Sequence, residues 1–309
     1  MKNNHSNIKK SKYLLEKNEC VGIPTETVYG LAANAYSNEA TSKIFKLKKR
    51  PKKNPLIVHY HDIHNLKKDC VINSNFKKLF KRFCPGPITF ILKLKKSNKI
   101  SKNVTNNKKT LAVRFPSHDL TVKLLRSLNF PLAAPSANIS TKISAVSKKD
   151  VEEEFGKKIK YILNGGRSKL GLESTIIDLS KRPKIIRLGA IEIEKIKKIL
   201  NCKLEYIYGG KQNYPGQSKL HYSPGLPIRV NAKKAKQNEA FILIQKRKLD
   251  KKNYFYLSKK KNLREAGKNL YKTLRNIKRK NFKFISVEKI PNVGIGRTIN
   301  DRLKRASYK

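Results

Sequence analysis

Long apolar segments are missing from this sequence of 309 residues. No run approaches the roughly 18–20 apolar residues that a membrane-spanning helix needs. The first residues, Met1 to His5, lead into a lysine-rich segment rather than into the apolar core of a signal peptide. We therefore expect a cytoplasmic protein with no membrane association.

Cysteine is scarce, and its spacing excludes the common zinc and redox motifs. No two of the cysteines have the two-residue gap typical of such pairs, so we expect free thiols in a reducing cytosol. The four positions are Cys20, Cys70, Cys84 and Cys202. Three catalytic signatures are also absent: the Gly-x-x-x-x-Gly-Lys-Ser/Thr phosphate loop, the Gly-x-Gly-x-x-Gly dinucleotide turn and the Gly-x-Ser-x-Gly elbow.

Acidic residues are few, which leaves a large excess of positive charge. Asp and Glu number 21 against 72 Lys and Arg, so the formal net charge is +51. Such a charge is typical of proteins that bind a polyanion such as tRNA. It also follows from an A/T-rich genome, because Lys, Asn and Ile share A/T-rich codons. The cations form no single block, which favours codon bias and leaves a weak tRNA or RNA contact as the alternative.

Short apolar runs alternate with segments of helical spacing, and this pattern predicts an α/β fold with a mixed sheet. The expected strands are 20–23, 56–58, 88–92, 111–113, 176–177 and 185–186. The expected helices are 8–17, 38–49, 74–83, 118–128, 147–155 and 191–200. Ser37 or Asn38 would cap the second helix, and Ser147 with Asp150 forms a capping-box pattern.

A segment rich in Gly, Pro and Tyr interrupts this pattern at 208–227 and predicts a linker between two domains, 1–207 and 228–309. The second domain is a small α/β block. Its expected elements are strands at 240–244, 253–257 and 283–287 and helices at 262–277 and 297–306.

Several polar groups follow predicted strands, at the edge where open α/β sheets bind ligands. Pro24 to Gly30 comes directly after a buried strand and carries hydroxyl groups and one carboxylate, a pattern that a capped turn also explains. Lys48 and Arg50 end a helix, where they either complement its dipole or clamp an anion. Arg114 leaves an apolar strand and needs a partner, such as a ligand carboxylate.

Further polar groups lie at 134–140, which follows an apolar strand, at 173–175, which precedes a predicted strand, and at Arg187, which ends another. Three histidines, His59, His61 and His64, lack a cysteine or carboxylate pair to complete a metal site, so we interpret them as serving separate roles. Together the loops predict a cleft lined with Ser, Thr, Asn, Lys and Arg that binds an anionic small ligand. These loops alone do not indicate which reaction the protein catalyses.

Taken in order, these segments resemble the YrdC-like family of threonylcarbamoyl-AMP synthases over about residues 10–200. The matching segments are Pro24–Leu31, Lys48-x-Arg50-Pro51, Asn54–His59, Pro85–Thr89, Val113–Pro116, Pro135–Asn138, Glu173–Ile176 and Arg187–Gly189. The linker residues Tyr214-Pro215-Gly216 and His221–Pro224, with the stretch Arg297–Ala306, resemble the long form with an extra C-terminal domain. Lys49 departs from the family, in which small residues are common at this position.

The resemblance implies a twisted, concave, open mixed sheet of the YrdC/RibB-like type followed by a small Rossmann-like α/β domain. It implies a nucleotidyltransferase that makes threonylcarbamoyl-AMP from L-threonine, bicarbonate and ATP and releases pyrophosphate. A downstream tRNA threonylcarbamoyl-transfer complex would use the product to modify tRNA. Magnesium would accompany ATP, and no tightly bound organic cofactor is expected.

The resemblance also implies site residues, among which Lys48 and Arg50 would be catalytic. The residues facing ATP would be Lys48, Arg50, Asn54, Thr110, Ser136, Asn138, Ser144, Arg187 and His221. Those facing threonine would be Thr25 or Thr27, His59, Arg114, Ala134 and Ser174. Arg114 would pair with the threonine carboxylate, and no residue is expected to bind a metal.

Two other functions compete with this one. A basic protein of the same fold would bind RNA or tRNA without catalysis, and its affinity would fall steeply with salt. A carbamoyl-transferring relative normally carries zinc-binding cysteine pairs, which this sequence lacks. Because the expected product is labile, we also expect the segment 211–224 to cover the site as a lid.

Overall fold

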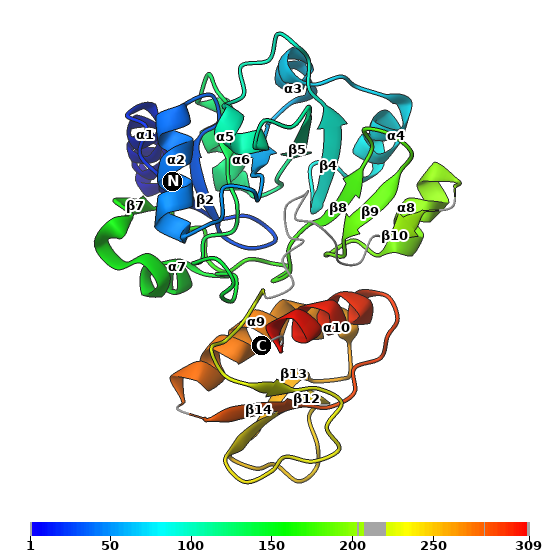
Figure 1. Ribbon diagram of the computed structural model, residues 1–309. Coiled ribbons are helices and arrows are strands. Elements are labelled where there is room, and N and C mark those ends of the chain that lie inside the picture. The colour runs from blue at the N-terminus through cyan, green and yellow to red at the C-terminus, as the bar shows by residue number, and fades with distance from the viewer. Residues whose placement is uncertain (1, 203, 207–220, 281, 308–309) are drawn as a thin grey trace.

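A computed structural model describes residues 2–202, 204–206, 221–280 and 282–307. The described elements form two sheets with their own helices (Figure 1). The sequence therefore predicted the α/β class and the mixed sheet correctly. Most of the expected linker at 208–227, and of the expected lid at 211–224, lies outside the described residues.

The first part of the chain supplies the larger sheet. Its elements are α1 (Lys2–Glu16), β1 (Val21–Ile23), β2 (Gly30–Asn34), α2 (Asn38–Lys48), β3 (Ile57–His59), α3 (Ile63–Asp69), α4 (Ser74–Phe83), β4 (Ile88–Lys93), α5 (Lys102–Thr105), β5 (Thr110–Arg114), α6 (Asp119–Arg126), β6 (Leu132–Ala133), α7 (Lys148–Phe155), the 3-10 helix η1 (Gly156–Lys158), β7 (Tyr161–Ile162), β8 (Thr175–Asp178), β9 (Lys184–Arg187), α8 (Ile193–Leu200) and β10 (Glu205–Tyr206). The second part supplies β11 (Ile228–Arg229), β12 (Glu239–Gln245), β13 (Tyr254–Ser258), α9 (Leu263–Arg279), β14 (Phe284–Val287) and α10 (Ile295–Ala306).

The larger sheet has ten strands in the order β10-β9-β8-β4-β5-β3-β6-β2-β1-β7. The pairs β10–β9, β8–β4, β5–β3 and β1–β7 are parallel, and the other neighbours are antiparallel. Side chains alternate across the sheet, so Leu31 and Ala33 of β2 join one core cluster and Ala32 joins another. Helices therefore cover both faces, and the strand ends are left for the site.

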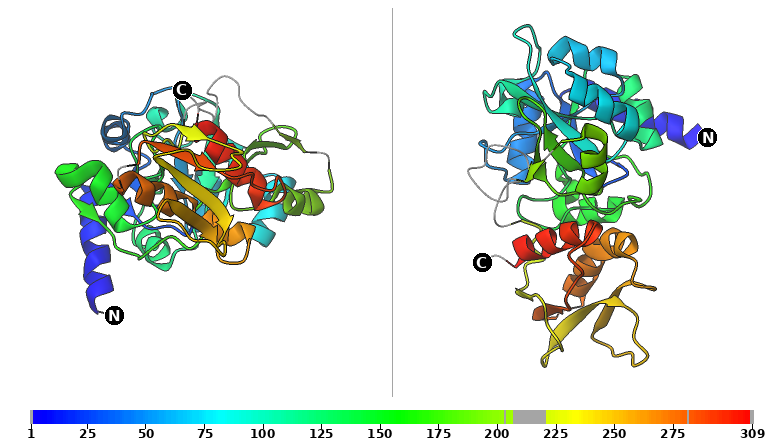
Figure 2. Two further views of the ribbon diagram at one scale, coloured as in Figure 1. Left: turned by 90° about the horizontal axis from the view of Figure 1, so that it is seen from below. Right: turned by 90° about the vertical axis from the view of Figure 1, so that its right-hand side faces the viewer.

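The smaller sheet, in the order β11-β14-β12-β13, is parallel throughout. Helices α9 and α10 lie between this sheet and the first part of the molecule (Figures 1 and 2). Their apolar core extends across the boundary to Val28, Ile143 and Leu172 of the first part. The two parts therefore share a continuous buried contact.

Helix boundaries follow the capping signals. Ser37, rather than Asn38, caps α2 and accepts a hydrogen bond from the Ala40 backbone amide, and Ser147 caps α7. Lys49 ends α2 in the left-handed conformation with φ of 49°, which small residues such as Gly adopt more readily. Among the described helices, none combines the length and apolar character that crossing a bilayer requires.

Candidate active site

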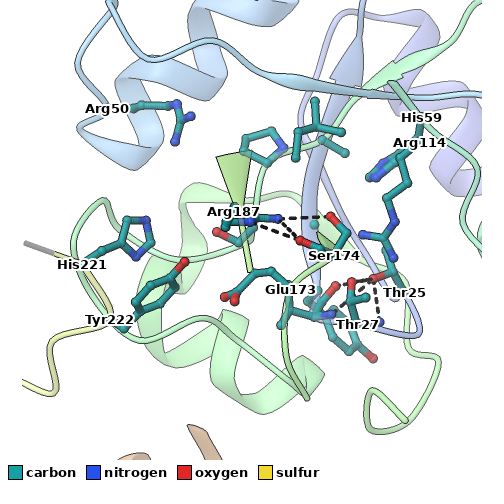
Figure 3. Close-up of a pocket in the computed structure, with 17 residues that line it drawn as sticks. Thr25, Thr27, Arg50, His59, Arg114, Glu173, Ser174, Arg187, His221 and Tyr222 are labelled. Carbon is teal, nitrogen blue, oxygen red and sulfur yellow. Dashed lines mark hydrogen bonds between the residues drawn. The ribbon is translucent and has the colours of Figure 1, made fainter. Parts of the chain in front are cut away.

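A cavity lies where β1, β3, β5 and β9 end and β2 and β8 begin (Figure 3). It contains about 590 Å³ of empty space, including space open to solvent. Its lining residues are Thr25, Thr27, Val28, Tyr29, Gly30, Arg50, Ile57, His59, Arg114, Ala134, Pro135, Ser136, Glu173, Ser174, Arg187, His221 and Tyr222. The sheet thus brings together segments that are far apart in the sequence.

The threonine loop after β1, residues 24–29, is held by its own hydroxyl groups. The Thr25 hydroxyl donates to the Val28 carbonyl at 2.6 Å and accepts from the Thr27 amide at 3.2 Å. It also lies 2.8 Å from the Thr27 hydroxyl. Because the Thr25 proton is committed to Val28, Thr27 donates in this pair and keeps acceptor capacity. The geometry therefore favours Thr27 over Thr25 as a ligand contact.

Arg114 ends β5 beside His59, which is its partner in the β3–β5 register. Arg114 Nη2 donates to Glu26 Oε1 at 2.7 Å, so Arg114 has a protein partner, and its pairing with a ligand carboxylate stays a prediction. Both residues are buried, so a protein carboxylate already balances this charge. In the described structure, Arg114 Nε and His59 Nδ1 have no hydrogen-bond partner. These two atoms belong to cavity residues, and neighbouring protein groups do not use their hydrogen-bonding capacity.

Arg50 and Arg187 supply the positive charge of the cavity. Arg50 donates to the Asn54 side chain at 2.6 Å and to the Pro55 carbonyl at 2.8 Å, which fixes its guanidinium plane. Burial and the charge of Arg187 lower the pKa of Arg50 to about 9, so Arg50 stays protonated at neutral pH. Arg187 Nη2 donates to the Ser174 carbonyl at 2.9 Å and to its hydroxyl at 3.1 Å. Both arginines are thus held in place by neutral acceptors, and the nearby charge of Glu173 partly offsets that of Arg187.

Lys48 is not among the residues that line the cavity, and its contact with the nucleotide stays a prediction. Its side chain is buried, and Nζ donates to the backbone carbonyls of Ser136 and Asn138. The physical reason is that Lys48 lies on the inner face of α2, from which its ammonium group reaches the 135–138 loop. Its observed contacts position that loop.

Four other predicted nucleotide residues are not among those that line the cavity. Asn54 orients Arg50 as described, and the Asn138 side chain donates to the Ile139 and Lys142 carbonyls. Ser144 Oγ donates to Glu173 Oε1 at 2.6 Å. Thr110 is the first residue of β5 and pairs with Lys93 in the sheet. Each is engaged by neighbouring protein groups, so direct ligand contact by these residues stays a prediction.

His59 and His221 are neutral imidazoles at the cavity. Burial, and then the charge of Arg114, holds the pKa of His59 well below its usual range. Burial also holds the pKa of His221 well below its usual range, despite the opposing effect of Glu173. Neither ring adds positive charge at neutral pH, so each offers one ring nitrogen as a donor and one as an acceptor.

Glu173 and Tyr222 are among the cavity residues that were not assigned a role from the sequence. Glu173 belongs to a segment that was noted for its polar character, and Tyr222 follows His221 in the linker motif. Two partners of Glu173, Tyr271 and Arg302, come from helices 98 and 129 residues away, which no local pattern indicates. Within the described residues, no group of three His, Cys, Asp or Glu side chains could hold a metal ion.

Figure 3 shows the cavity residues in two groups. Arg50 and His221 lie on one side, and the opposite side has His59, Arg114 and the two threonines, with Arg187 and Glu173 between them. The first group offers cationic and imidazole donors. The second offers a hydroxyl group, an imidazole and a partly free guanidinium. Such a cavity can hold two different polar ligands next to each other, one of them strongly anionic.

Comparisons with known proteins match both parts of the chain. A family model described as Telomere recombination matches residues 13–189, and one described as Threonylcarbamoyl-AMP synthase, C-terminal domain, matches residues 191–307. A threonylcarbamoyl-AMP synthase of Pyrococcus abyssi is 34% identical, over 95% of this chain and 92% of its own length. One from Bacillus subtilis is 33% identical, over 98% of this chain and 94% of its own length.

Solved structures extend the similarity to three dimensions. The crystal structure of P. abyssi Sua5 in complex with L-threonine matches with a TM-score of 0.89 at 32% identity, covering 97% of this chain and 94% of that one. Escherichia coli YciO, at 22% identity, shares the fold over 59% of this chain and 88% of its own, with a TM-score of 0.54. This chain therefore belongs to the threonylcarbamoyl-AMP synthase family, in the form that has the Sua5 C-terminal domain.

Proposed function

We propose that this chain is an L-threonylcarbamoyladenylate synthase. It joins L-threonine, bicarbonate and the AMP part of ATP, and it releases pyrophosphate. The observation that supports this most directly is the assembly of one cavity from the threonine loop, Arg50, the 135–136 segment, Ser174 and Arg187. The near full-length similarity to synthases, one of them solved with L-threonine, supports the same substrate.

Threonine occupies the side of the cavity with Thr27, His59 and Arg114. The free Arg114 Nε and the His59 ring suit a carboxylate and a hydroxyl group, respectively. ATP occupies the side with Arg50, Arg187 and His221, where two cations face the phosphates. Ser174, which is held by Arg187, lies where the two ligands meet.

The chemistry needs positioning more than covalent catalysis. The threonine amine attacks the carbon of bicarbonate-derived carbon dioxide and loses a proton, which gives a carbamate. A carbamate oxygen then attacks the α-phosphorus, and the bond to the pyrophosphate oxygen breaks. Arg50 and Arg187 orient the phosphates and offset the charge of the transition state, while the cavity holds the two reactants next to each other.

Magnesium would enter with ATP, because phosphate oxygens and water are its preferred ligands. The described residues supply no metal-binding cluster of their own, which suits an ion held mainly by the nucleotide. When bound, it would neutralise phosphate charge. The product would pass to a tRNA threonylcarbamoyl-transfer complex in the cytoplasm.

The direct test is mass-spectrometric detection of threonylcarbamoyl-AMP, omitting ATP, threonine or bicarbonate in turn. We expect product only when all three are present. Arg50→Ala should lower the rate by about 100-fold or more, since it removes a fixed cation at the phosphates. Arg182→Ala, an exposed arginine remote from the cavity lining, is the matched control and should match wild type.

Lys48→Ala provides a second test of the same site. It frees the Ser136 and Asn138 carbonyls, so the 135–138 loop should shift and the KM for ATP should rise. Wild-type rates in both Arg50→Ala and Lys48→Ala would show that this cavity is not the site. If the protein binds tRNA yet makes no product from the three substrates, it is an RNA-binding member of the fold.

A further inference from the structure

Glu173 is a buried carboxylate in the cavity wall that the proposed chemistry does not use. It is 5% exposed and directly precedes Ser174, which lies between the two ligand sides. An unpaired carboxylate at such a position would be costly and would repel the phosphates of ATP. Its partners therefore determine whether the cavity can accept an anion.

Two of the three side chains that hold Glu173 come from the C-terminal part of the chain. Tyr271 of α9 donates its hydroxyl to the carboxylate, at 2.9 Å from Oε2 and 3.0 Å from Oε1. Arg302 Nε of α10 donates to Oε2 at 2.9 Å. The third partner, Ser144, donates at 2.6 Å from within the first part.

Arg302 contacts more than Glu173. Its Nη2 donates to the Leu188 carbonyl at 2.6 Å, and its guanidinium group lies 4.7 Å from the centre of the Tyr222 ring. Glu173, Leu188 and Tyr222 each adjoin or form part of the cavity wall, next to Ser174, Arg187 and His221, respectively. One side chain, only 1% exposed, thus joins three wall segments that are distant in sequence.

The charge of Glu173 is compensated without a ligand. Burial opposes ionisation of Glu173, but Arg302, Arg187 and the Ser144 hydroxyl outweigh it and lower the pKa of Glu173 to about 2. The carboxylate is therefore ionised at neutral pH and stays directed towards Arg302 and Tyr271. Tyr222 also stacks on Tyr271 with ring centres 5.7 Å apart, which links the aromatic wall to the same cluster.

We propose that Arg302, together with Tyr271, is a positioning residue for the active site: it holds the segments at Glu173, Leu188 and Tyr222 in the arrangement that lets threonine and ATP react. The proposal rests on the proposed function of the cavity. Under this proposal the C-terminal domain is part of the catalytic architecture. The last helix of that domain, α10, supplies the side chain that joins the three segments of the cavity wall.

Simple attachment of the domains does not require Arg302. Arg275 Nη2 donates to the Ile143 carbonyl at 2.7 Å, and Arg279 pairs with Asp150 at 3.1 Å and Glu153 at 2.7 Å. The described cavity lining does not include these acceptors. The domains are therefore also held together by contacts outside the described cavity lining. A variant that loses one of these contacts tests the effect of weaker docking alone and provides a control.

The experiment compares Tyr271→Phe, Arg302→Lys and Arg302→Met with wild type in the full-length protein. Tyr256→Phe, whose hydroxyl contacts Asp250 near the surface, controls for Tyr271, and Arg279→Met controls for the loss of an interdomain arginine. The measurements are kcat, the KM for threonine and for ATP, the melting temperature, and calorimetric binding of threonine and ATP with its stoichiometry.

Misplaced reactants should lower kcat and raise KM at unchanged binding stoichiometry. We expect about a 10-fold loss of kcat/KM for Tyr271→Phe and about 10- to 100-fold for Arg302→Met at temperatures where each variant is folded. Arg302→Lys keeps the charge but not all three contacts, so it should fall in between. Both controls should keep wild-type kcat/KM.

A double variant makes the test decisive. If Arg302 acts through Glu173, Glu173→Gln combined with Arg302→Met should lose about as much as the more damaging single variant. Losses that multiply would refute the action of Arg302 through Glu173, and single variants with wild-type kcat and KM would overturn the whole proposal. A smaller fraction of binding-competent molecules with unchanged KM would also overturn the proposal, because that result indicates a folding defect alone. A wild type that makes no product would instead refute the proposed function, and ligand binding by the variants would still test the positioning.

Discussion

His59 and His221 form parts of the cavity wall as neutral rings, one at the end of β3 and the other beside the C-terminal helices. A neutral imidazole donates and accepts hydrogen bonds without adding charge, which suits a site that already contains Arg50, Arg114 and Arg187. Protonation of either ring would place one more positive charge in a buried cationic site. The need to keep both rings neutral should therefore lower the stability of the folded protein at acidic pH.

Stability should fall as the pH drops below about 6.5, the usual pKa of histidine. There the unfolded chain binds protons at both rings and the folded chain does not, because its pKa values are depressed. The free energy of unfolding should thus decrease by up to about 1.4 kcal/mol per pH unit for each ring. Urea unfolding between about pH 7 and pH 5 measures this slope, in a range above the titration of ordinary carboxylates.

Replacing either ring should flatten the slope. His59→Gln and His221→Gln each remove one titrating group, so each curve should lose up to about 1.4 kcal/mol per pH unit relative to wild type. His5→Gln, at an exposed position in α1, is the control and should leave the slope unchanged. Parallel curves for wild type and both cavity variants would contradict the conclusion that these two rings are neutral in the folded protein.

Helix α7 begins at the cap residue Ser147 and runs under the interdomain contact. The Ser147 hydroxyl accepts from the Asp150 amide at 3.3 Å, and Asp150 in turn accepts from the Val146 amide at 3.0 Å. Arg279 of α9 pairs with Asp150. The cap therefore stabilises both the helix end and a carboxylate that anchors the C-terminal domain.

Ser147→Ala should cost about 1 kcal/mol of unfolding free energy, because the Asp150 amide loses its side-chain acceptor. Ser147→Asp restores an acceptor at the cap position and should recover most of the loss. Chemical denaturation of the two variants beside wild type measures both effects. Equal loss in Ala and Asp variants would mean that the hydroxyl does not act as a cap.

Local signals of this kind explain which elements could be predicted from the sequence. The helices at 38–48, 74–83 and 148–155 have side-chain caps, and their apolar spacing is clear. Strand β2, with the sequence Gly-Leu-Ala-Ala-Asn, was missed because its small residues lack β propensity. Its burial between β1 and β6 decides its conformation, and that pairing is a tertiary effect.

At the candidate site too, tertiary contacts decided what could not be predicted from the sequence. The resemblance to the synthase family placed Arg50, Ser136, Ser174 and Arg187 correctly at one cavity. Sequence reasoning did not predict that Lys48 would turn towards backbone carbonyls, because only the path of the 135–138 loop decides this. Sequence reasoning also did not predict the ion pair between Arg114 and Glu26. The partner of Arg114 depends on how the threonine loop folds back over β5.

Positive charge dominates the whole molecule, with a formal net charge of +51. Surface ion pairs such as Lys12–Glu16 contribute only about 0–1 kcal/mol each and are weakened by salt. With 72 cationic side chains against 21 acidic ones, repulsion between like charges outweighs these pairs. The folded state should therefore be less stable at low ionic strength.

The melting temperature should rise by several degrees between about 20 and 300 mM NaCl, as the Debye length shrinks below about 10 Å. Differential scanning calorimetry measures the shift. The same titration near the isoelectric point of about 10.3 is the control, because the net charge is then close to zero and the effect should vanish. A melting temperature that falls with salt at neutral pH would show that ion pairs dominate.

The position of Arg302 in the chain has a consequence for how the protein is made. Chains fold from the N-terminus as they are synthesised. Every strand of the ten-stranded sheet and every residue that lines the cavity is translated before α10. A nascent chain can thus complete that sheet and still lack the side chain that joins its wall segments. If Arg302 positions the site, activity is acquired only when α10 docks, and truncated translation products that retain the whole sheet stay inactive.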